Sequence, residues 1–73
     1  MRFTCHFAHP KNGERKTFLA TLTPEELRSV EAIRASNGDD QAALIAEALA
    51  LRAGYREFPG FLHVEPPTLV SVS

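Results

Sequence analysis

Residues 16–27, KTFLATLTPEEL, join a predicted strand to a predicted helix and decide the fold. Alternate positions from Phe18 to Leu22 are apolar, which indicates a strand with one buried face. The sequence Thr23-Pro24-Glu25-Glu26 follows, with a capping hydroxyl, a proline at the first helical position and a glutamate three residues after the cap. We therefore expect a helix to begin directly after the threonine.

The residues before this stretch predict another strand, which pairs with the strand at Phe18–Leu22 to form a hairpin. Asn12-Gly13 is typical of a two-residue type I′ turn between two alternating flanks. Such a turn pairs Phe7 with Phe18 and Cys5 with Ala20, so these apolar side chains share one face. The opposite face would carry Arg2, Thr4, His6, Ala8, Arg15, Thr17, Leu19 and Thr21.

Two helices are predicted after the hairpin. The first has a narrow apolar stripe and ends at Asn37-Gly38. The second begins at Asp39 or Asp40, either of which is a good cap, and ends at Gly54. Glu47 is its only polar residue between positions 42 and 51, so the helix needs apolar cover on several sides. A second copy of the chain would cover the helix most simply, and the tail of the same chain is the other candidate.

The last segment is predicted to be extended, with short strands over residues 61–64 and 68–72. Its residues Phe58, Phe61 and Leu62 are too apolar for a solvated tail, so we expect them to pack along the hairpin edge or over a dimer seam. The predicted fold class is α+β: one domain with a hairpin (1–23), two helices (24–54) and an extended tail (55–73), in the order ββαα.

Composition limits the class of protein. The chain has 73 residues, 44% of them hydrophobic, a single Cys and a net charge of −1. So short a chain has a marginal core, and one cysteine forms no internal disulfide, so a partner subunit is expected. No apolar stretch reaches the roughly 18 to 20 residues that span a bilayer, and the expected compartment is the cytoplasm. The charge is uneven: residues 1–23 carry +3 and residues 24–73 carry −4.

Residues 17–56 resemble the ribbon-helix-helix family of small dimeric DNA-binding proteins and antitoxins. The resemblance rests on the alternating strand, the Thr-Pro-Glu-Glu-Leu helix start, Val30 and Ile33, Gly38 at the turn, and the run 44–49 in the second helix. It implies a homodimer in which one strand from each subunit forms a ribbon that enters the major groove of double-stranded DNA. The additional strand over residues 2–9 leaves two arrangements open. Either the dimer holds a four-stranded sheet, or the hairpin pairs within the chain and displaces the ribbon.

The resemblance also assigns residue roles. Side chains facing the groove would be Thr17, Leu19 and Thr21, with phosphate contacts from Arg2, Lys11, Arg15 and Lys16. The N-terminal amides of the second helix, at Asp39, Asp40 and Gln41, would approach the phosphates. The dimer core would contain Phe18, Ala20, Leu22, Leu44, Ile45, Ala48 and Leu49.

Catalytic and metal-binding signatures are absent from the sequence. There is no nucleophile elbow, P-loop, dinucleotide-binding glycine pattern or metalloprotease motif, so we expect neither an enzyme nor a cofactor. Cys5 and His6 point to opposite faces of a strand and cannot bind one metal ion together. His6 shares the outer face with Arg2 and Arg15, where a protonated imidazole would help to bind an anion. Two functions remain open: a small transcriptional regulator or antitoxin-like DNA binder, and a protein-interaction module that binds no nucleic acid.

Overall fold

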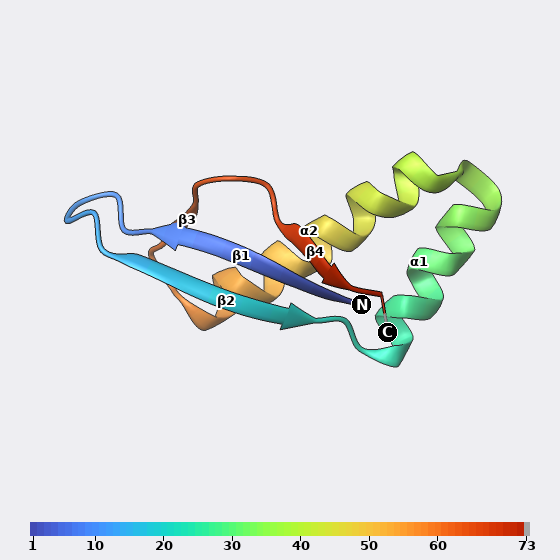
Figure 1. Cartoon of the computed structure of the whole chain (residues 1–73), viewed down its shortest axis with the longest axis horizontal. Coiled ribbons are helices and arrows are strands. Elements are labelled where there is room, and N and C mark those ends of the chain that lie inside the picture. The colour runs from blue at the N-terminus through green and yellow to red at the C-terminus, as the bar shows by residue number, and fades with distance from the viewer. Residues whose placement is uncertain (73) are drawn as a thin grey trace.

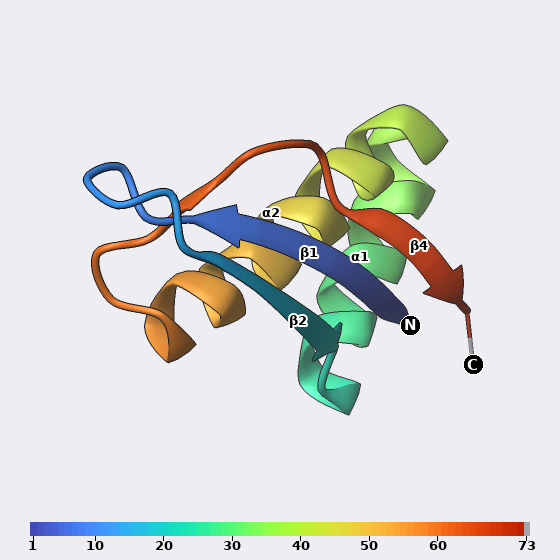
Figure 2. The same ribbon diagram turned by 60° about the vertical axis from the view of Figure 1, so that its left-hand side comes forward.

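The computed structural model describes residues 1–72 and has the order ββααββ (Figure 1). The strands are β1 (Arg2–Ala8), β2 (Arg15–Thr21), β3 (Leu62–His63) and β4 (Thr68–Ser71), and the helices are α1 (Pro24–Asn37) and α2 (Asp39–Glu57). Strand β1 is central: β2 pairs with one of its edges, and β3 and β4 pair with its other edge. Helix α2 lies across one face of this sheet, and α1 packs on α2 beyond the strand ends (Figures 1 and 2). The predicted ββαα order and α+β class are confirmed.

The hairpin turn differs from the prediction. Strands β1 and β2 pair Cys5 with Phe18 and Phe3 with Ala20, two residues away from the predicted register. The loop is therefore residues 10–13: the His9 amide donates to the Glu14 carbonyl at 2.8 Å, and the Gly13 amide donates to the His9 carbonyl at 2.9 Å. Pro10 has no amide proton for a ladder and its fixed φ suits a turn position, which explains the longer loop. A shift of two residues preserves the faces, so the predicted buried and outer sides are confirmed.

The first helix starts as predicted. The Glu26 amide donates to the Thr23 hydroxyl at 3.1 Å, and the Thr23 amide donates to the Glu26 carboxylate at 2.8 Å. This capping box satisfies two amides that the helix itself leaves unpaired. Helix α1 ends at Asn37, with Gly38 at a φ of 94°, a backbone conformation that suits glycine.

The second helix starts at Asp39, one of the two predicted positions, but its predicted cap and its predicted end are wrong. Gly38 occupies the N-cap position with no side-chain cap, so Asp39 and Asp40 lie inside the first turn, where they complement the helix dipole. The helix also continues through Gly54 to Glu57. Gly54 is buried because the ring of Phe7 lies against it, and a Cβ built there would meet the ring Cζ at 2.3 Å. The glycine therefore makes room for the ring instead of ending the helix.

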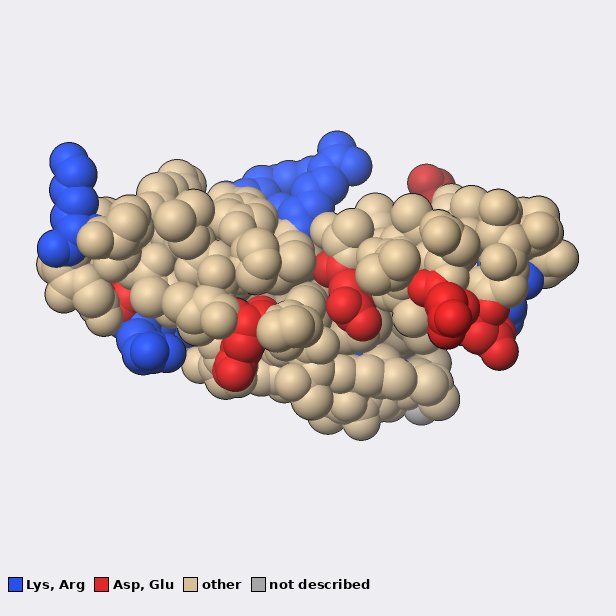
Figure 3. All heavy atoms as spheres, turned by 90° about the horizontal axis from the view of Figure 1, so that it is seen from above, with Lys and Arg blue, Asp and Glu red and all other residues tan. Residues whose placement is uncertain are grey.

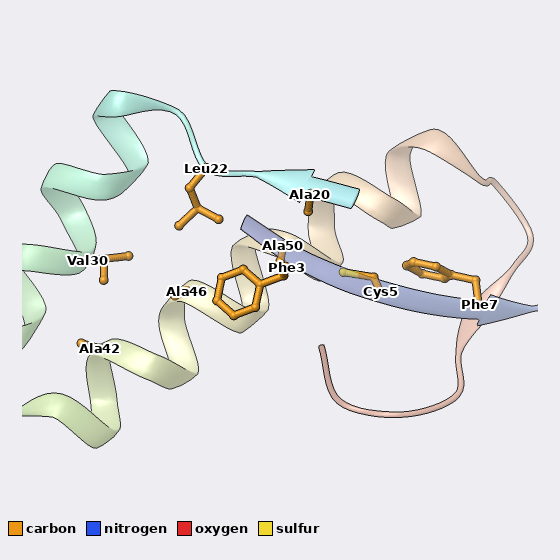
Figure 4. Packing of buried hydrophobic residues seen from close by; sticks show 9 residues of the cluster. All are labelled: Phe3, Cys5, Phe7, Ala20, Leu22, Val30, Ala42, Ala46 and Ala50. Carbon is orange, nitrogen blue, oxygen red and sulfur yellow. The ribbon is translucent and has the colours of Figure 1, made fainter. Parts of the chain in front are cut away.

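The core lies between β1 and one narrow side of α2 (Figure 4). Three side chains of β1, Phe3, Cys5 and Phe7, are buried against a ridge of small residues, one per helical turn. The ridge consists of Ala42, Ala46, Ala50 and Gly54. Leu22 and Val30 close the end of the core where α1 packs on α2. The small side chains let the helix lie close to the strand, so the chain buries this side of α2 by itself.

The tail lies along β1, as one of the expected arrangements had it. Aromatic rings fasten it: Phe58 packs edge-on against Phe7 at 5.8 Å and against Phe18 at 5.9 Å between centroids, and Phe61 packs against His9 at 5.2 Å. Edge-on aromatic contacts of this kind are favourable at these spacings. Leu62, expected to be packed, is instead 55% exposed, because its pairing with Ala8 turns it to the outer face of the sheet.

Substitution Gly54→Ala tests the close contact between α2 and β1. An alanine in an exposed helical position stabilises by roughly 1 kcal/mol relative to glycine. At Gly54 the new methyl would overlap the buried Phe7 ring, and such overpacking costs about 1–3 kcal/mol. We expect Gly54→Ala to lower the free energy of unfolding in urea, and Phe7→Leu to reduce that loss in the double variant. A stabilised Gly54→Ala variant would show that the ring moves aside freely.

Candidate functional site

The outer edge of β2 is the longest open sheet edge of the described chain. Within residues 1–72, β2 pairs only with β1, over seven residues and without a register shift. The opposite side of the sheet is divided between the two residues of β3 and the four of β4, with an irregularity in the β4 pairing. Short and irregular strands protect an edge, whereas a long regular strand presents a template for another strand.

Backbone groups of alternate β2 residues point away from β1. Two hydrogen bonds mark the ends of the β1–β2 ladder. The His9 amide donates to the Glu14 carbonyl at one end, and the Leu22 amide donates to the Met1 carbonyl at the other. Because hydrogen-bonded pairs alternate in an antiparallel ladder, Lys16, Phe18 and Ala20 direct their amides and carbonyls to β1. The residues between them direct theirs to the open edge: Arg15, Thr17, Leu19 and Thr21.

The same four residues place their side chains on the outer face of the sheet, which no helix covers (Figure 2). All four are exposed, and Leu19 is 53% exposed although it is a large apolar residue. Thr17, Leu19 and Thr21, the residues expected to face DNA, therefore do lie together on one uncovered face. Leu62 and Val64 are also exposed, at 55% and 45%.

The four basic residues expected to contact phosphate do not form one cluster. Lys11 lies in the hairpin loop, and Arg15 lies at the adjacent end of β2 on the outer face. Arg2 pairs with Thr21 at the other end of the hairpin, about 20 Å away along the strand. Lys16 pairs with Phe7, so it belongs to the opposite face, and its ammonium lies 3.2 Å from the Glu14 carboxylate.

A polar row crosses the outer face beside this edge. The Thr17 hydroxyl and the His6 Nδ1 lie 3.3 Å apart, and the His6 Nε2 lies 3.5 Å from the Glu65 carboxylate. The sequence placed Thr17 and His6 on one face correctly. It gave no signal for Glu65, because the register of the tail on β1 depends on where the aromatic residues dock. The carboxylate gives His6 an acidic neighbour, which counts against its binding an anion.

The residues expected in a dimer core divide into two groups. Ala20 and Leu22 are buried within the single chain, and Phe18 and Leu49 are half-buried. The other group is exposed and lies on the side of α2 turned away from the small-residue ridge. It consists of Leu44, which is 59% exposed, Ile45, which is 37% exposed, and Ala48. Sheet and tail therefore cover only part of the apolar surface of α2.

The acidic start of α2 is engaged within the chain. The Arg34 guanidinium pairs with Glu31, which raises the arginine pKa above its ordinary value, and its Nε lies 3.1 Å from the Asp39 carboxylate. Asp39, Asp40 and Gln41 are all exposed. Two carboxylates at this helix start repel an anion, so the expected approach of phosphate to these amides has no electrostatic support.

Metal and ligand chemistry has no assembled site within residues 1–72. No group of three His, Cys, Asp or Glu side chains converges there, and that part of the surface has no pocket. Cys5 is fully buried in the core, and burial raises the pKa of its thiol above the ordinary value, so it is a poor nucleophile. Tyr55 and His63 are hydrogen-bonded to each other, which fastens β3 to α2. No helix of this part of the chain is long and apolar enough to cross a bilayer.

Comparison with known proteins yields no relative of this chain. No protein-family model, no curated protein and no solved structure matches it.

Proposed function

We propose that this chain is a protein-interaction module that binds an extended segment of a polypeptide along the open edge of β2. The observation that carries the proposal is the seven-residue regular edge, whose outward amides and carbonyls have no strand partner within residues 1–72. Addition of a strand to such an edge is an established mode of peptide recognition, in which the backbone supplies affinity and the side chains supply specificity.

The composition of β2 supports this use of its edge. Proteins protect long edges with proline, bulges or inward charges, and β2 has no proline and no bulge. Its charges, Arg15 and Lys16, stand only at the loop end, so the remaining edge from Thr17 to Thr21 is uncharged. Each backbone hydrogen bond to an added strand contributes a net of roughly 0.5–1.5 kcal/mol, and exposed Leu19 offers apolar contact on the outer face.

A peptide with the sequence of residues 14–22 tests the edge. In excess over the labelled protein, it should shift the amide resonances of Thr17, Leu19 and Thr21 and slow their hydrogen exchange, because these amides acquire acceptors. The Thr17→Pro protein is the matched control: it loses an outward amide but none of its bonds to β1, so it should fold and bind the peptide at least several-fold more weakly. Unchanged edge amides at millimolar peptide would refute the proposal.

A ribbon-helix-helix-like DNA-binding dimer is the second candidate, and the outer face of β2 is the observation that favours it. Thr17, Leu19 and Thr21 lie exposed on that face together with Arg15. Two observations weigh against it. Glu65 stands on the same side of the sheet as His6. In addition, β1 flanks β2, so a two-chain sheet measures about 14 Å between its outer β1 strands, against a major groove about 12 Å wide.

Duplex DNA of random sequence tests this candidate. A phosphate-contacting protein binds it at about 50 mM salt and loses affinity steeply as salt rises. The double variant Arg15→Glu/Lys16→Glu should then weaken binding at least tenfold and flatten the salt dependence, whereas Glu57→Gln, remote on α2, should change neither. Absence of binding at about 50 mM salt would eliminate the DNA candidate without affecting the peptide experiment.

A further inference from the structure

We infer that the polypeptide segment bound along β2 runs antiparallel to it and carries acidic residues at its C-terminal end, after uncharged strand-forming residues. The inference rests on the proposed function and names the class of partner. Three features carry it: the backbone groups of the open edge, the partly exposed ring of Phe18, and the position of the only two charged residues of β2.

The backbone groups of the open edge favour an antiparallel segment. Amides and carbonyls point outward from the odd-numbered residues of β2, which are Arg15, Thr17, Leu19 and Thr21. An antiparallel segment exchanges two hydrogen bonds with each of them, so a segment as long as β2 forms about eight bonds. A parallel segment pairs through slanted bonds and is slightly less stable per residue. The bound segment therefore runs with its C-terminal end beside Arg15.

Phe18 sets the character of the middle of the segment. Its side chain lies on the inner face of the sheet, half-buried, and packs edge-on against Phe58 at 5.9 Å between centroids. The bound residue opposite Phe18 exchanges no hydrogen bonds with it, and opposed side chains approach most closely at such a pair. An aromatic or β-branched side chain there covers the exposed part of the ring and forms a stabilising cross-strand contact. Leu19, which is 53% exposed, favours the same class of side chain at the neighbouring position on the outer face.

Arg15 and Lys16 determine the charge of the segment's C-terminal end. They are the only charged residues of β2 and are neighbours at the hairpin-loop end of the strand. Arg15 has no ion-pair partner within residues 1–72, whereas the Lys16 ammonium lies 3.2 Å from the Glu14 carboxylate. Bound residues opposite these two cations lie one strand spacing away, about 5 Å, where opposite charges stabilise the pair and like charges destabilise it. Acidic residues are therefore expected at both positions.

The other charged groups around the loop end do not reverse this preference. Glu65 lies beside His6 on the tail side of β1, at least two strand spacings, about 10 Å, from a segment bound to β2. Arg56 and Glu57, at the end of α2, carry opposite charges. Lys11, in the loop, adds a cation without an ion-pair partner in the described part of the chain. In Figure 3, basic side chains project at the hairpin-loop end of the molecule.

The opposite end of β2 has no comparable preference for one sign of charge. The strand itself is uncharged from Thr17 to Thr21. Arg2 pairs with Thr21 from β1, so it lies two strand spacings, about 10 Å, from a bound segment, beyond the Debye length of about 8 Å at physiological salt. The groups that surround this end carry both signs: Arg2 and the Met1 amino group at the start of β1, and Glu25 and Glu26 in the first turn of α1. Acidic residues of the segment are therefore favoured at the loop end.

Two peptides of identical composition test the orientation. The acetylated and amidated peptide TTVFTEE, bound antiparallel, places its glutamates opposite Lys16 and Arg15 and its phenylalanine opposite Phe18. The reversed sequence EETFVTT reaches the same contacts only as a parallel strand. In titrations of the labelled chain that follow the outward amides of β2, TTVFTEE should bind at least threefold more tightly than EETFVTT. Equal affinities, or tighter binding of the reversed peptide, would overturn the inference.

A charge exchange tests the preference of the loop end. Arg15→Glu should weaken the binding of TTVFTEE several-fold and strengthen that of the peptide TTVFTKK, because attraction and repulsion exchange places. Arg28→Glu is the matched control: it makes the same change of net charge at an exposed arginine of α1 and should leave both affinities unchanged. If the unaltered chain binds TTVFTEE and TTVFTKK equally tightly, this inference is wrong while the proposed function stands. If neither peptide shifts the outward amides of β2, the proposed function is wrong as well.

Discussion

The close packing of β1 on the small-residue ridge of α2 (Ala42, Ala46, Ala50 and Gly54) is the contact on which the rest of the structure depends. Three residues of β1 are buried there, and Phe7 lies so near Gly54 that the helix has no room for a side chain at that turn. A narrow ridge of small residues lets a helix and a strand approach without a gap, and close-packed interiors tolerate no loss of that fit. The second helix therefore completes its core within one chain.

The sheet topology leaves one long edge open. Helix α2 contacts β1 and β2, and both edges of β1 are paired. Strand β2 takes one edge through the hairpin, and the tail takes the other after the aromatic residues Phe58 and Phe61 turn it back. The outward amides and carbonyls of β2 are thus the longest regular set of backbone groups left to the solvent. A marginal core of this size gains from a partner that satisfies them.

The apolar surface of α2 has a related explanation. Its residues were expected to need cover on several sides, yet only the small-residue ridge of α2 is buried, and Leu44, Ile45 and Ala48 remain exposed. Small residues bury little area each, so the helix is held by close approach and by Phe7, Tyr55 and Phe58 at its C-terminal end. The apolar character of a helix shows that it needs cover, but it does not show which side the sheet covers.

The sequence by itself determined the local structure: the capping box at Thr23, the order of elements, and the alternation that separates the buried Phe3, Cys5 and Phe7 from the outer face. These follow from hydrogen bonds and periodicities that act within a few residues. Only the tertiary structure decided the hairpin register, the burial of Gly54 inside α2, and the position of Glu65 beside His6. Each of these features depends on which surfaces pack together in the fold. That packing is set by the shapes of side chains far apart in sequence, which local sequence patterns do not reveal.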